Sequence, residues 1–223
     1  MLLAIDTSSV ACSVALQIGD SVVERHEEQP REHTRILLPM IRSALQESGA
    51  RITELEAIVL GNGPGSFIGM RIAASVAQGL AFGGGLPIVP VSSMAAVAAE
   101  VFTAYDAAEV VVTQDAHMHQ VYLGVYGQDR DGLPTARHVE RLCDLAEISE
   151  LAGTAGRPRV AAGFGWQRYP ELLATNRGQF DEVSEILYPR ARHSLRLGAA
   201  VLQAGGALDP KAVERQLAEF LPK

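Results

Sequence analysis

The residues with the clearest chemical potential form a glycine-rich run, 61–71, with the sequence GNGPGSFIGMR. It follows the apolar segment 57–60 and precedes a helical pattern over 69–81. Glycines let the backbone approach an anion, and free N–H groups at a helix N-terminus favour negative charge, so this arrangement can bind phosphate. The run lacks the Lys-Ser/Thr of a Walker loop and does not match the dinucleotide fingerprint. Phosphate contact and a tight strand-to-helix turn therefore both remain open.

Two acids close predicted strands in a way that suits metal-assisted phosphoryl transfer. Asp6 ends the first predicted strand and is followed by Thr7 and Ser8, and Asp115 ends the first strand of the second half. Acids at such positions hold Mg²⁺ and orient water, because phosphoryl transfer depends on positioning and charge neutralisation. The alternative is an Asx-type turn, in which Asp6 and Thr7 satisfy backbone groups of their own loop.

Other reactive side chains give weaker patterns. His117 and His119 alternate at a predicted strand end, which would point both imidazoles the same way. With Asp115 they could ligate a metal, or they could form a solvent-exposed pair. The chain has no helical His-x₃-His pair, and Cys12 and Cys143 form neither a metal pair nor a disulfide framework. We therefore expect no metal and no cofactor, and the absence of a Gly-x-Ser-x-Gly elbow argues against a serine hydrolase.

Composition excludes several classes of protein. The 223 residues are 48% hydrophobic and 20% charged, which is typical of a globular chain of one large domain or two small ones. A net charge of −7 and a pI near 5.4 argue against unaided nucleic-acid binding, which needs a basic surface. No apolar run is long enough to span a membrane, and the start of the chain predicts no signal peptide. We expect a cytoplasmic location.

The predicted elements repeat one order twice. The first half predicts strands 2–6, 12–18 and 21–26, helix 33–48, strand 57–60, helix 69–81, strand 88–91 and helix 93–102. The second half predicts strands 110–115, 121–127 and 135–139, a helix near 144–151, strand 160–162 and a helix near 194–204.

This order predicts an α/β fold with a duplicated βββαβα unit. Two such units are ribonuclease-H-like lobes of the actin, Hsp70 and sugar-kinase type. We expect a first lobe over 1–103, a second, degenerate lobe over 104–208, and a C-terminal helix in 209–223 that packs back on the first lobe. The second-lobe turn at 163–166 is followed by no extended glycine loop, and no lysine lies near a glycine turn. The fold is therefore predicted with an incomplete active site.

Several motifs together resemble one family across nearly the whole chain, in order. They are IDTS (5–8), CSVAL (12–16), REHT (31–34), GPGSF (63–67) with Gly69 and Arg71, QGLA (78–81), PVSS (90–93) and Gly165-Trp166. They resemble the TsaB family, also called YeaZ. The resemblance implies a non-catalytic role in making tRNA threonylcarbamoyladenosine, the modified adenosine beside the anticodon in tRNAs that read ANN codons.

The resemblance also implies partners. TsaB-like proteins are similar to degenerate paralogues of the catalytic subunit TsaD, pair with TsaD through first-lobe helices, and help to recruit the ATPase TsaE. Contact with tRNA would then occur only through the complex. This chain departs from the family pattern at Ile68, where Thr is usual, at 117–120, where Arg-x-x-Glu is usual, and at Val213, where Tyr is expected.

Two predicted helices carry more apolar surface than one lobe needs. Helix 69–81 is apolar around nearly its whole circumference, and helix 33–48 has a wide apolar stripe. We predict a partner interface at Ile36, Leu37, Met40, Met70, Ala73, Ala74, Ala77 and Ala81. The alternative is a deeply buried helix pair. Alone, the chain could form a homodimer through the same strip, and the sequence does not rank homodimer against heterodimer.

The main hypothesis is thus a TsaD-binding subunit with a vestigial nucleotide loop. We assign to that loop Asp6, Thr7, Ser8, Gly63, Gly65, Ser66, Arg71 and Asp115. The alternatives are a nucleotide-dependent phosphotransferase of the actin-like group and a glycoprotease-like metalloenzyme.

Overall fold

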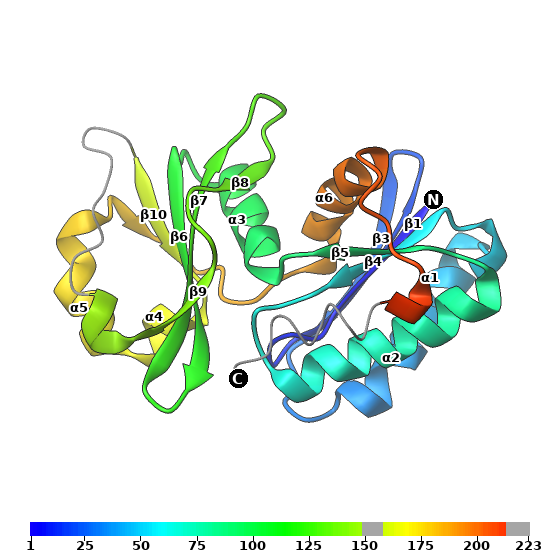
Figure 1. Cartoon of the computed structure of the whole chain (residues 1–223), viewed down its shortest axis with the longest axis horizontal. Coiled ribbons are helices and arrows are strands. Elements are labelled where there is room, and N and C mark those ends of the chain that lie inside the picture. The colour runs from blue at the N-terminus through cyan, green and yellow to red at the C-terminus, as the bar shows by residue number, and fades with distance from the viewer. Residues whose placement is uncertain (149–157, 213–223) are drawn as a thin grey trace. The chain divides into compact units, whose positions relative to one another are not determined.

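The chain folds into two compact units (Figure 1). A computed structural model describes residues 1–148 and 158–212. Unit 1 comprises Met1–Ser93 together with the chain from Pro189 onward, and unit 2 comprises Met94–Tyr188.

Unit 1 is built on a five-stranded sheet with the order β3-β2-β1-β4-β5. Its elements are β1 (Leu2–Asp6), β2 (Cys12–Ile18), β3 (Ser21–Glu27), α1 (His33–Ser48), β4 (Ala57–Gly61), α2 (Phe67–Gly84), β5 (Ile88–Val91) and α6 (Ala191–Gln203), with 3₁₀ turns at Ile52–Glu54 and Pro210–Ala212. β1, β2 and β3 pair antiparallel, with the turn at Gly19-Asp20 between β2 and β3, and β4 and β5 continue parallel to β1. Parallel strands buried on both faces need helices on each side.

Helices cover both faces of this sheet. α1 and α2 pack on one face, and α6 lies on the other, against β1, β2, β4 and β5 (Figure 1). The core between the sheet and α1 and α2 contains Leu3, Ile58, Leu37 and Ala77, all almost fully buried. α1 ends at Gly49, whose φ of 64° is the left-handed conformation that glycine adopts at no steric cost.

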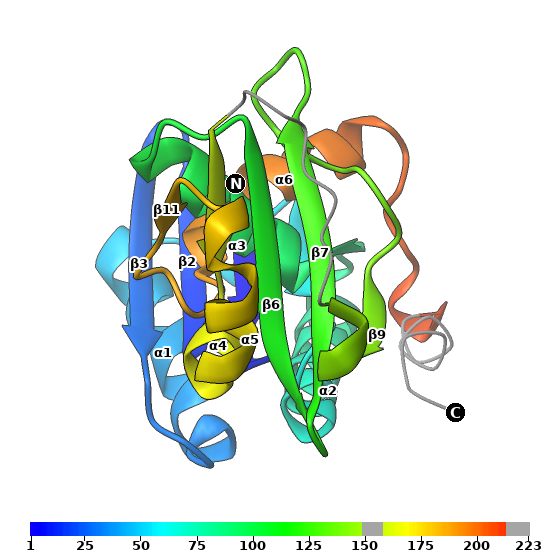
Figure 2. The ribbon, with the colours of Figure 1, turned by 90° about the vertical axis from the view of Figure 1, so that its left-hand side faces the viewer.

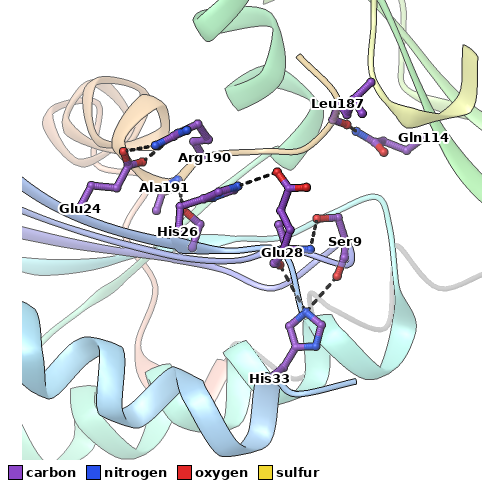
Figure 3. Close-up of polar contacts among 11 residues, drawn as sticks. Ser9, Glu24, His26, Glu28, His33, Gln114, Leu187, Arg190 and Ala191 are labelled. Atoms are coloured by element: carbon purple, nitrogen blue, oxygen red, sulfur yellow. Dashed lines mark hydrogen bonds and ion pairs between the residues drawn. The ribbon is translucent and has the colours of Figure 1, made fainter. Parts of the chain in front are cut away.

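Side chains from β2 and β3 hold the start of α6. The Arg190 guanidinium donates from Nη2 to Glu24 Oε2 at 2.7 Å, and the Ala191 N–H donates to Ser13 Oγ at 2.8 Å (Figure 3). Further along, Gly198 meets β4 so closely that a Cβ there would lie 2.4 Å from Val59 Cγ2. α6 thus belongs to unit 1, although it follows unit 2 in the sequence.

Unit 2 repeats the strand order of unit 1 with its own sheet, β11-β10-β6-β7-β8, and β9 also pairs with β7. Its elements are α3 (Ser93–Ala104), β6 (Glu109–His117), β7 (Gln120–Gln128), β8 (Pro134–Ala136), β9 (Arg141–Asp144), β10 (Arg159–Ala162), α4 (Phe164–Arg168), α5 (Pro170–Asn176) and β11 (Glu182–Val183), with 3₁₀ turns at Leu145–Ile148 and Arg177–Gln179. β10 runs parallel to β6 as β4 runs parallel to β1. The duplicated α/β fold is therefore confirmed.

α4 and α5 lie over one face of this second sheet (Figure 2). Trp166 anchors α4, because its indole N–H donates to the Val111 carbonyl at 3.2 Å. Its ring also meets the Phe180 ring edge-on, with the ring centroids 5.1 Å apart. Arg159 and Glu109, which are neighbours on β10 and β6, form a buried ion pair at 2.6 Å.

Several predicted boundaries differ from the structure. The division falls at 93/94 rather than 103/104, and the helix predicted near 194–204 packs in unit 1, because its apolar face fits the sheet of β1 and β4. The helix predicted near 144–151 is a 3₁₀ turn at Leu145–Ile148 as far as the described residues extend. Residues 213–223, which hold Val213 and most of the predicted last helix, lie outside the described residues. Within the described ranges, no helix is long and apolar enough to cross a membrane.

The contact between Gly198 and Val59 generates the first prediction. Gly198→Ala forces a methyl group against the stiff Val59 side chain, so we expect a loss of about 1–3 kcal/mol in the free energy of unfolding. Urea unfolding followed by far-UV circular dichroism measures it. Gly83→Ala in α2 is the matched control, because a Cβ there meets open space, and it should leave stability unchanged or raise it by up to about 1 kcal/mol. Equal stability of the two variants would contradict the close packing of α6.

Candidate functional site: a glycine turn and an apolar helix groove

The glycine-rich run joins β4 to α2 and presses against the loop that follows β1. A Cβ at Gly65 would lie 2.1 Å from the Ser8 carbonyl oxygen, and one at Gly69 would lie 1.9 Å from the Thr7 carbonyl oxygen. Only glycine permits these approaches. The Thr7 hydroxyl donates to the Gly69 carbonyl at 2.7 Å, which ties the first turn of α2 to the end of β1.

Several backbone donors of this run have protein acceptors. The Ser66 N–H donates to the Ser8 carbonyl at 2.6 Å, and the Gly63 N–H donates to Ser93 Oγ at 3.1 Å. The Gly69 N–H donates to Ser66 Oγ at 3.2 Å, so Ser66 caps the helix. A phosphate cradle needs such donors to be available to an anion. Of the two interpretations that the sequence leaves open, the geometry supports the tight turn.

Asp6 forms the Asx-type turn expected as the alternative to a metal ligand. Its Oδ1 accepts from the Ser8 N–H at 2.8 Å and from the Ser8 hydroxyl at 2.7 Å. Its Oδ2 is buried beside Gly61. Burial raises the pKa of Asp6, and the hydrogen bonds from Ser8 and Ser93 offset that effect only in part. A carboxyl group in this setting stabilises its loop and disfavours its own charge.

The position that corresponds to Asp6 in unit 2 is Thr113, not Asp115. Ile5 pairs with Leu60 just before Asp6, and Val112 pairs with Ala162 just before Thr113. A glycine packs beside each of these two positions. Gly61, at the end of β4, packs beside Asp6, and Gly163, which follows β10, packs beside Thr113, where a Cβ would lie 2.2 Å from the Thr113 carbonyl oxygen. The expected equivalence of Asp115 is therefore wrong by two residues, since β6 is longer than β1.

Asp115 is instead engaged with its neighbours in unit 2. Its Oδ1 accepts from the Tyr169 hydroxyl and from the His117 N–H, each at 2.9 Å. Its Oδ2 lies 3.8 Å from Arg168 Nε and 3.4 Å from the exposed His117 imidazole. Burial and the Asp115 carboxylate raise the pKa of Tyr169. These contacts fix the start of α5 against the end of β6.

His117 and His119 do not alternate along a strand as expected. His117, Met118 and His119 have φ values of 64°, 50° and 61°, so they form a left-handed turn between β6 and β7. His119 packs near the Tyr169 ring, with the ring centroids 6.2 Å apart. Across residues 1–148 and 158–212, no group of three or more His, Cys, Asp or Glu side chains is placed to hold a metal.

Both cysteines lie in the cores of their units. Cys12 and Cys143 are free and buried, and burial raises the pKa of the Cys12 thiol to about 12. Neither thiol is therefore placed to act as a nucleophile.

A groove of about 480 Å³ lies between α1 and α2. Its lining is mostly apolar and consists of His33, Thr34, Leu37, Leu38, Phe67, Ile68, Arg71, Ile72, Ser75 and Val76. Leu38 is 50% exposed and Ile68 is 71% exposed, although both are large apolar side chains. Exposed apolar surface gathered in a groove marks a binding site more often than a chance feature.

His33 lines this groove and holds the start of α1 in place. Its Nε2 lies 3.0 Å from the Ser9 carbonyl and 3.3 Å from the Ala11 carbonyl (Figure 3). Two carbonyl oxygens can only accept, so Nε2 carries the proton. The imidazole thereby joins the start of α1 to the loop between β1 and β2, the same loop that the glycine turn contacts.

Of the eight residues predicted as a partner interface, Leu37 belongs to the groove lining and the other seven do not. Seven are buried in unit 1, and Ile36 is partly buried against the same core. The seven are Leu37, Met40, Met70, Ala73, Ala74, Ala77 and Ala81. For these positions the structure favours the alternative of a deeply buried helix pair.

The sequence pattern did not identify the exposed apolar residues Leu38, Phe67, Ile68 and Phe82 as interface candidates. For those on α2, the polar residues Arg71 and Ser75 were a usable signal, because they mark the solvent side of that helix.

Known proteins with similar sequences or structures carry the names TsaB, TsaD and YeaZ. A family profile described as TsaD, tRNA N6-adenosine threonylcarbamoyltransferase, matches residues 24–163. The tRNA threonylcarbamoyladenosine biosynthesis protein TsaB of Escherichia coli K12 is 35% identical over 204 residues, which covers 92% of this chain and 88% of that protein. The TsaB protein of Haemophilus influenzae is 46% identical over 208 residues, covering 88% of this chain and 84% of that protein.

A solved structure supports the same relationship. The crystal structure of an uncharacterized protein from Pseudomonas aeruginosa, described as similar to peptidase YEAZ, matches with a TM-score of 0.86 at 33% identity. The match covers 94% of this chain and 95% of that one.

The buried carboxyl group of Asp6 generates a prediction about pH. Because burial raises its pKa above the ordinary 3.8, the native state holds this proton more tightly than the unfolded chain does. The free energy of unfolding therefore falls as the pH rises from 3.8 through the raised value. Asp6→Asn has no ionisable group at this position, so it lacks this pH-dependent loss. In urea titrations, the free energy of unfolding of the variant relative to that of wild type should therefore increase from acidic to neutral pH.

The control for this prediction is Asp106→Asn, which changes an exposed carboxylate in unit 2. Its stability difference from wild type should not vary in the same way with pH. A pH-independent difference between Asp6→Asn and wild type would mean that Asp6 has the same pKa in the native and unfolded states, which contradicts a raised pKa.

Proposed function

The chain belongs to the TsaB family, also called YeaZ, and on that premise we propose that it is a non-catalytic subunit of the machinery that makes tRNA threonylcarbamoyladenosine. A role in threonylcarbamoyladenosine biosynthesis follows from the family itself. The proposal concerns how this chain takes part. It binds a TsaD-type catalytic subunit through the groove between α1 and α2 and supports that subunit, while the chemistry takes place on the partner.

The groove is the observation that carries this proposal. Large apolar side chains line it and remain exposed, and the helices below it are anchored to the sheet by buried small residues. Burying exposed apolar surface stabilises a complex by about 25 cal/mol for each Å² removed from water. An apolar groove between two helices fits the apolar face of a partner helix, which is a recurring mode of protein recognition.

The glycine turn supports the non-catalytic part of the proposal. Its N–H groups at Gly63, Ser66 and Gly69 are satisfied within unit 1, and Asp6 is buried in an Asx-type turn. Ile68 adds an exposed apolar side chain where the family pattern has a hydroxyl. Of the residues assigned to a vestigial nucleotide loop, Thr7, Ser8, Gly65 and Ser66 thus serve to fix where α2 begins.

No observation favours the two alternative functions. A phosphotransferase needs donors for nucleotide phosphates, and the N–H groups of Gly63, Ser66 and Gly69 already donate within unit 1. A glycoprotease-like metalloenzyme needs a set of metal ligands, and the described residues present none.

The remaining parts of the proposal concern the wider assembly. We propose that the pair formed with the TsaD-type subunit helps to recruit the TsaE ATPase. A net charge of −7 on the whole chain supports tRNA contact through the complex rather than through this chain alone. Bacterial tRNA lies in the cytoplasm, so we place the protein there.

The first test removes the apolar groove without touching the core. We expect the double variant Leu38→Asp, Ile68→Asp to lose its complex with the cognate TsaD-type protein, because each carboxylate would have to be desolvated against an apolar helix. Both side chains are exposed, so the fold should survive. Co-purification and size-exclusion chromatography measure the complex, and circular dichroism measures the fold.

Two variants serve as controls for this test. Met118→Asp changes a side chain that is 91% exposed on unit 2, and it should bind like wild type. Ala74→Asp puts a charge into the buried core of unit 1 and should unfold it rather than only prevent binding. A wild-type chain that forms no complex with the cognate TsaD-type protein contradicts the proposed function.

A second test addresses catalysis. We expect titration of the isolated chain with Mg-ATP to release no binding heat in calorimetry, because the N–H groups of Gly63, Ser66 and Gly69 donate within unit 1. Stoichiometric binding would revive the phosphotransferase alternative. The TsaD-type protein from the same cell, titrated in the same buffer, is the comparison.

A further inference from the structure

Residues 204–212 form a strap that runs from the end of α6 to the side of α2 (Figure 1). Leu208 of this strap forms an isolated antiparallel bridge with Ile88 of β5, and its side chain packs against the core of unit 1. Gln78 of α2 donates from Nε2 to the Pro210 carbonyl at 3.0 Å. The strap thus lies along the β5 edge of the sheet in unit 1.

The bridge satisfies both backbone groups that Ile88 presents to the open edge of β5. The Ile88 N–H donates to the Leu208 carbonyl at 3.0 Å, and the Leu208 N–H donates to the Ile88 carbonyl at 2.7 Å. The carbonyls of Pro87 and Val91 accept from N–H groups in and just after β4, because alternate residues of a strand face opposite edges. Pro90 therefore faces the open edge with Ile88, and proline has no N–H to offer there. One bridge and one proline together account for the hydrogen-bond donors of this edge.

The two edges of this sheet are protected in different ways. β3 forms the opposite edge and carries Glu24, Arg25, His26 and Glu27. Charged side chains on an edge strand oppose pairing with another chain. β5 has the sequence IVPV and carries no charge. Without the strap, β5 would present an uncharged apolar edge, which is the kind of edge that pairs with another strand.

We propose that the strap blocks pairing between the β5 edges of two copies of the chain, and that its release turns this edge into a site of self-association. A second copy fits this site because two identical uncharged edges can pair antiparallel about a twofold axis. A bridge between two single residues opens more readily than a long ladder, so the strap can be released while the sheet stays folded. The β5 edge is separate from the groove between α1 and α2, and the inference does not depend on a TsaD-type partner.

Leu208→Pro tests the strap, because proline has no N–H to donate to the Ile88 carbonyl. The substitution is made in the Leu38→Asp, Ile68→Asp background, so that association through the groove does not contribute. We expect the Ile88 amide to exchange with deuterium about tenfold faster in residue-resolved NMR, and self-association in sedimentation velocity to become about tenfold tighter. Far-UV circular dichroism checks that the fold is retained.

Ala207→Pro in the same background is the matched control, because the Ala207 N–H has no hydrogen-bond acceptor among the described residues. It should change the Ile88 exchange rate and the self-association constant by less than about twofold.

Pro90→Val tests the same edge with the strap in place. It restores an N–H at the open edge and keeps an uncharged side chain that suits a strand, so the fold should be retained. Self-association should become tighter than in the background protein but less tight than with Leu208→Pro. The two substitutions together should give the tightest self-association.

Unchanged Ile88 exchange in a folded Leu208→Pro variant would show that the bridge does not close this edge. Faster exchange without tighter self-association, in that variant and in the double variant, would show that the strap does not block pairing. If Leu208→Pro does not fold, Pro90→Val decides the question, and self-association no tighter than that of the background protein overturns the inference. None of these results bears on the complex with the TsaD-type protein.

Discussion

The contact between the Thr7–Ser8 loop and the glycine turn is the constraint on which the rest of unit 1 depends. Thr7 donates to the Gly69 carbonyl, and the Ser66 N–H donates to the Ser8 carbonyl, so α2 begins at a fixed place beside β1. His33 ties α1 to the same loop. The positions of α1 and α2, which form the walls of the groove, therefore both depend on one short segment of backbone. A shift in that segment would move both helices together rather than close the groove.

The same contact explains why the chain can have a loop with the glycine pattern of a phosphate-binding loop that does not need a phosphate for its structure. Glycine is required at 65 and 69 by the approach of the Ser8 and Thr7 carbonyl groups, whether or not a ligand is present. Unit 2 shows the same packing at Gly163, where the neighbouring residue is Thr113 and not an acid. The glycines are thus demanded by the fold, while the acid is not. A glycine-rich turn between a strand and a helix is consequently weak evidence for catalysis in this fold.

Much of the fold follows from local patterns, and the groove does not. The bounds of α1, its end at Gly49 and the Gly19-Asp20 hairpin depend on nearby residues, so they were predictable. β9 and β11 are short strands that are defined by pairing with strands distant in the sequence. α4 is defined by the packing of Trp166 on β6, so local patterns did not predict these three elements. α2 is apolar around most of its circumference, so its hydrophobic period is weak, and the exposed residues Arg71 and Ser75 are the signal that marks its solvent side. Its alanines are buried, whereas Ile68 and Phe82 are exposed, so apolar character alone selected the wrong residues.

That inversion follows from how α2 packs. The small side chains Ala73, Ala77 and Ala81 face the sheet, which lets the helix backbone lie close to β1 and β4. Phe67, Ile68, Ile72 and Val76 are left to line the groove against α1. An exposed surface of this kind promotes association with any apolar face, including its own copy. Ile68 therefore remains available to a partner helix, because the packing of α2 on the sheet uses its alanines instead.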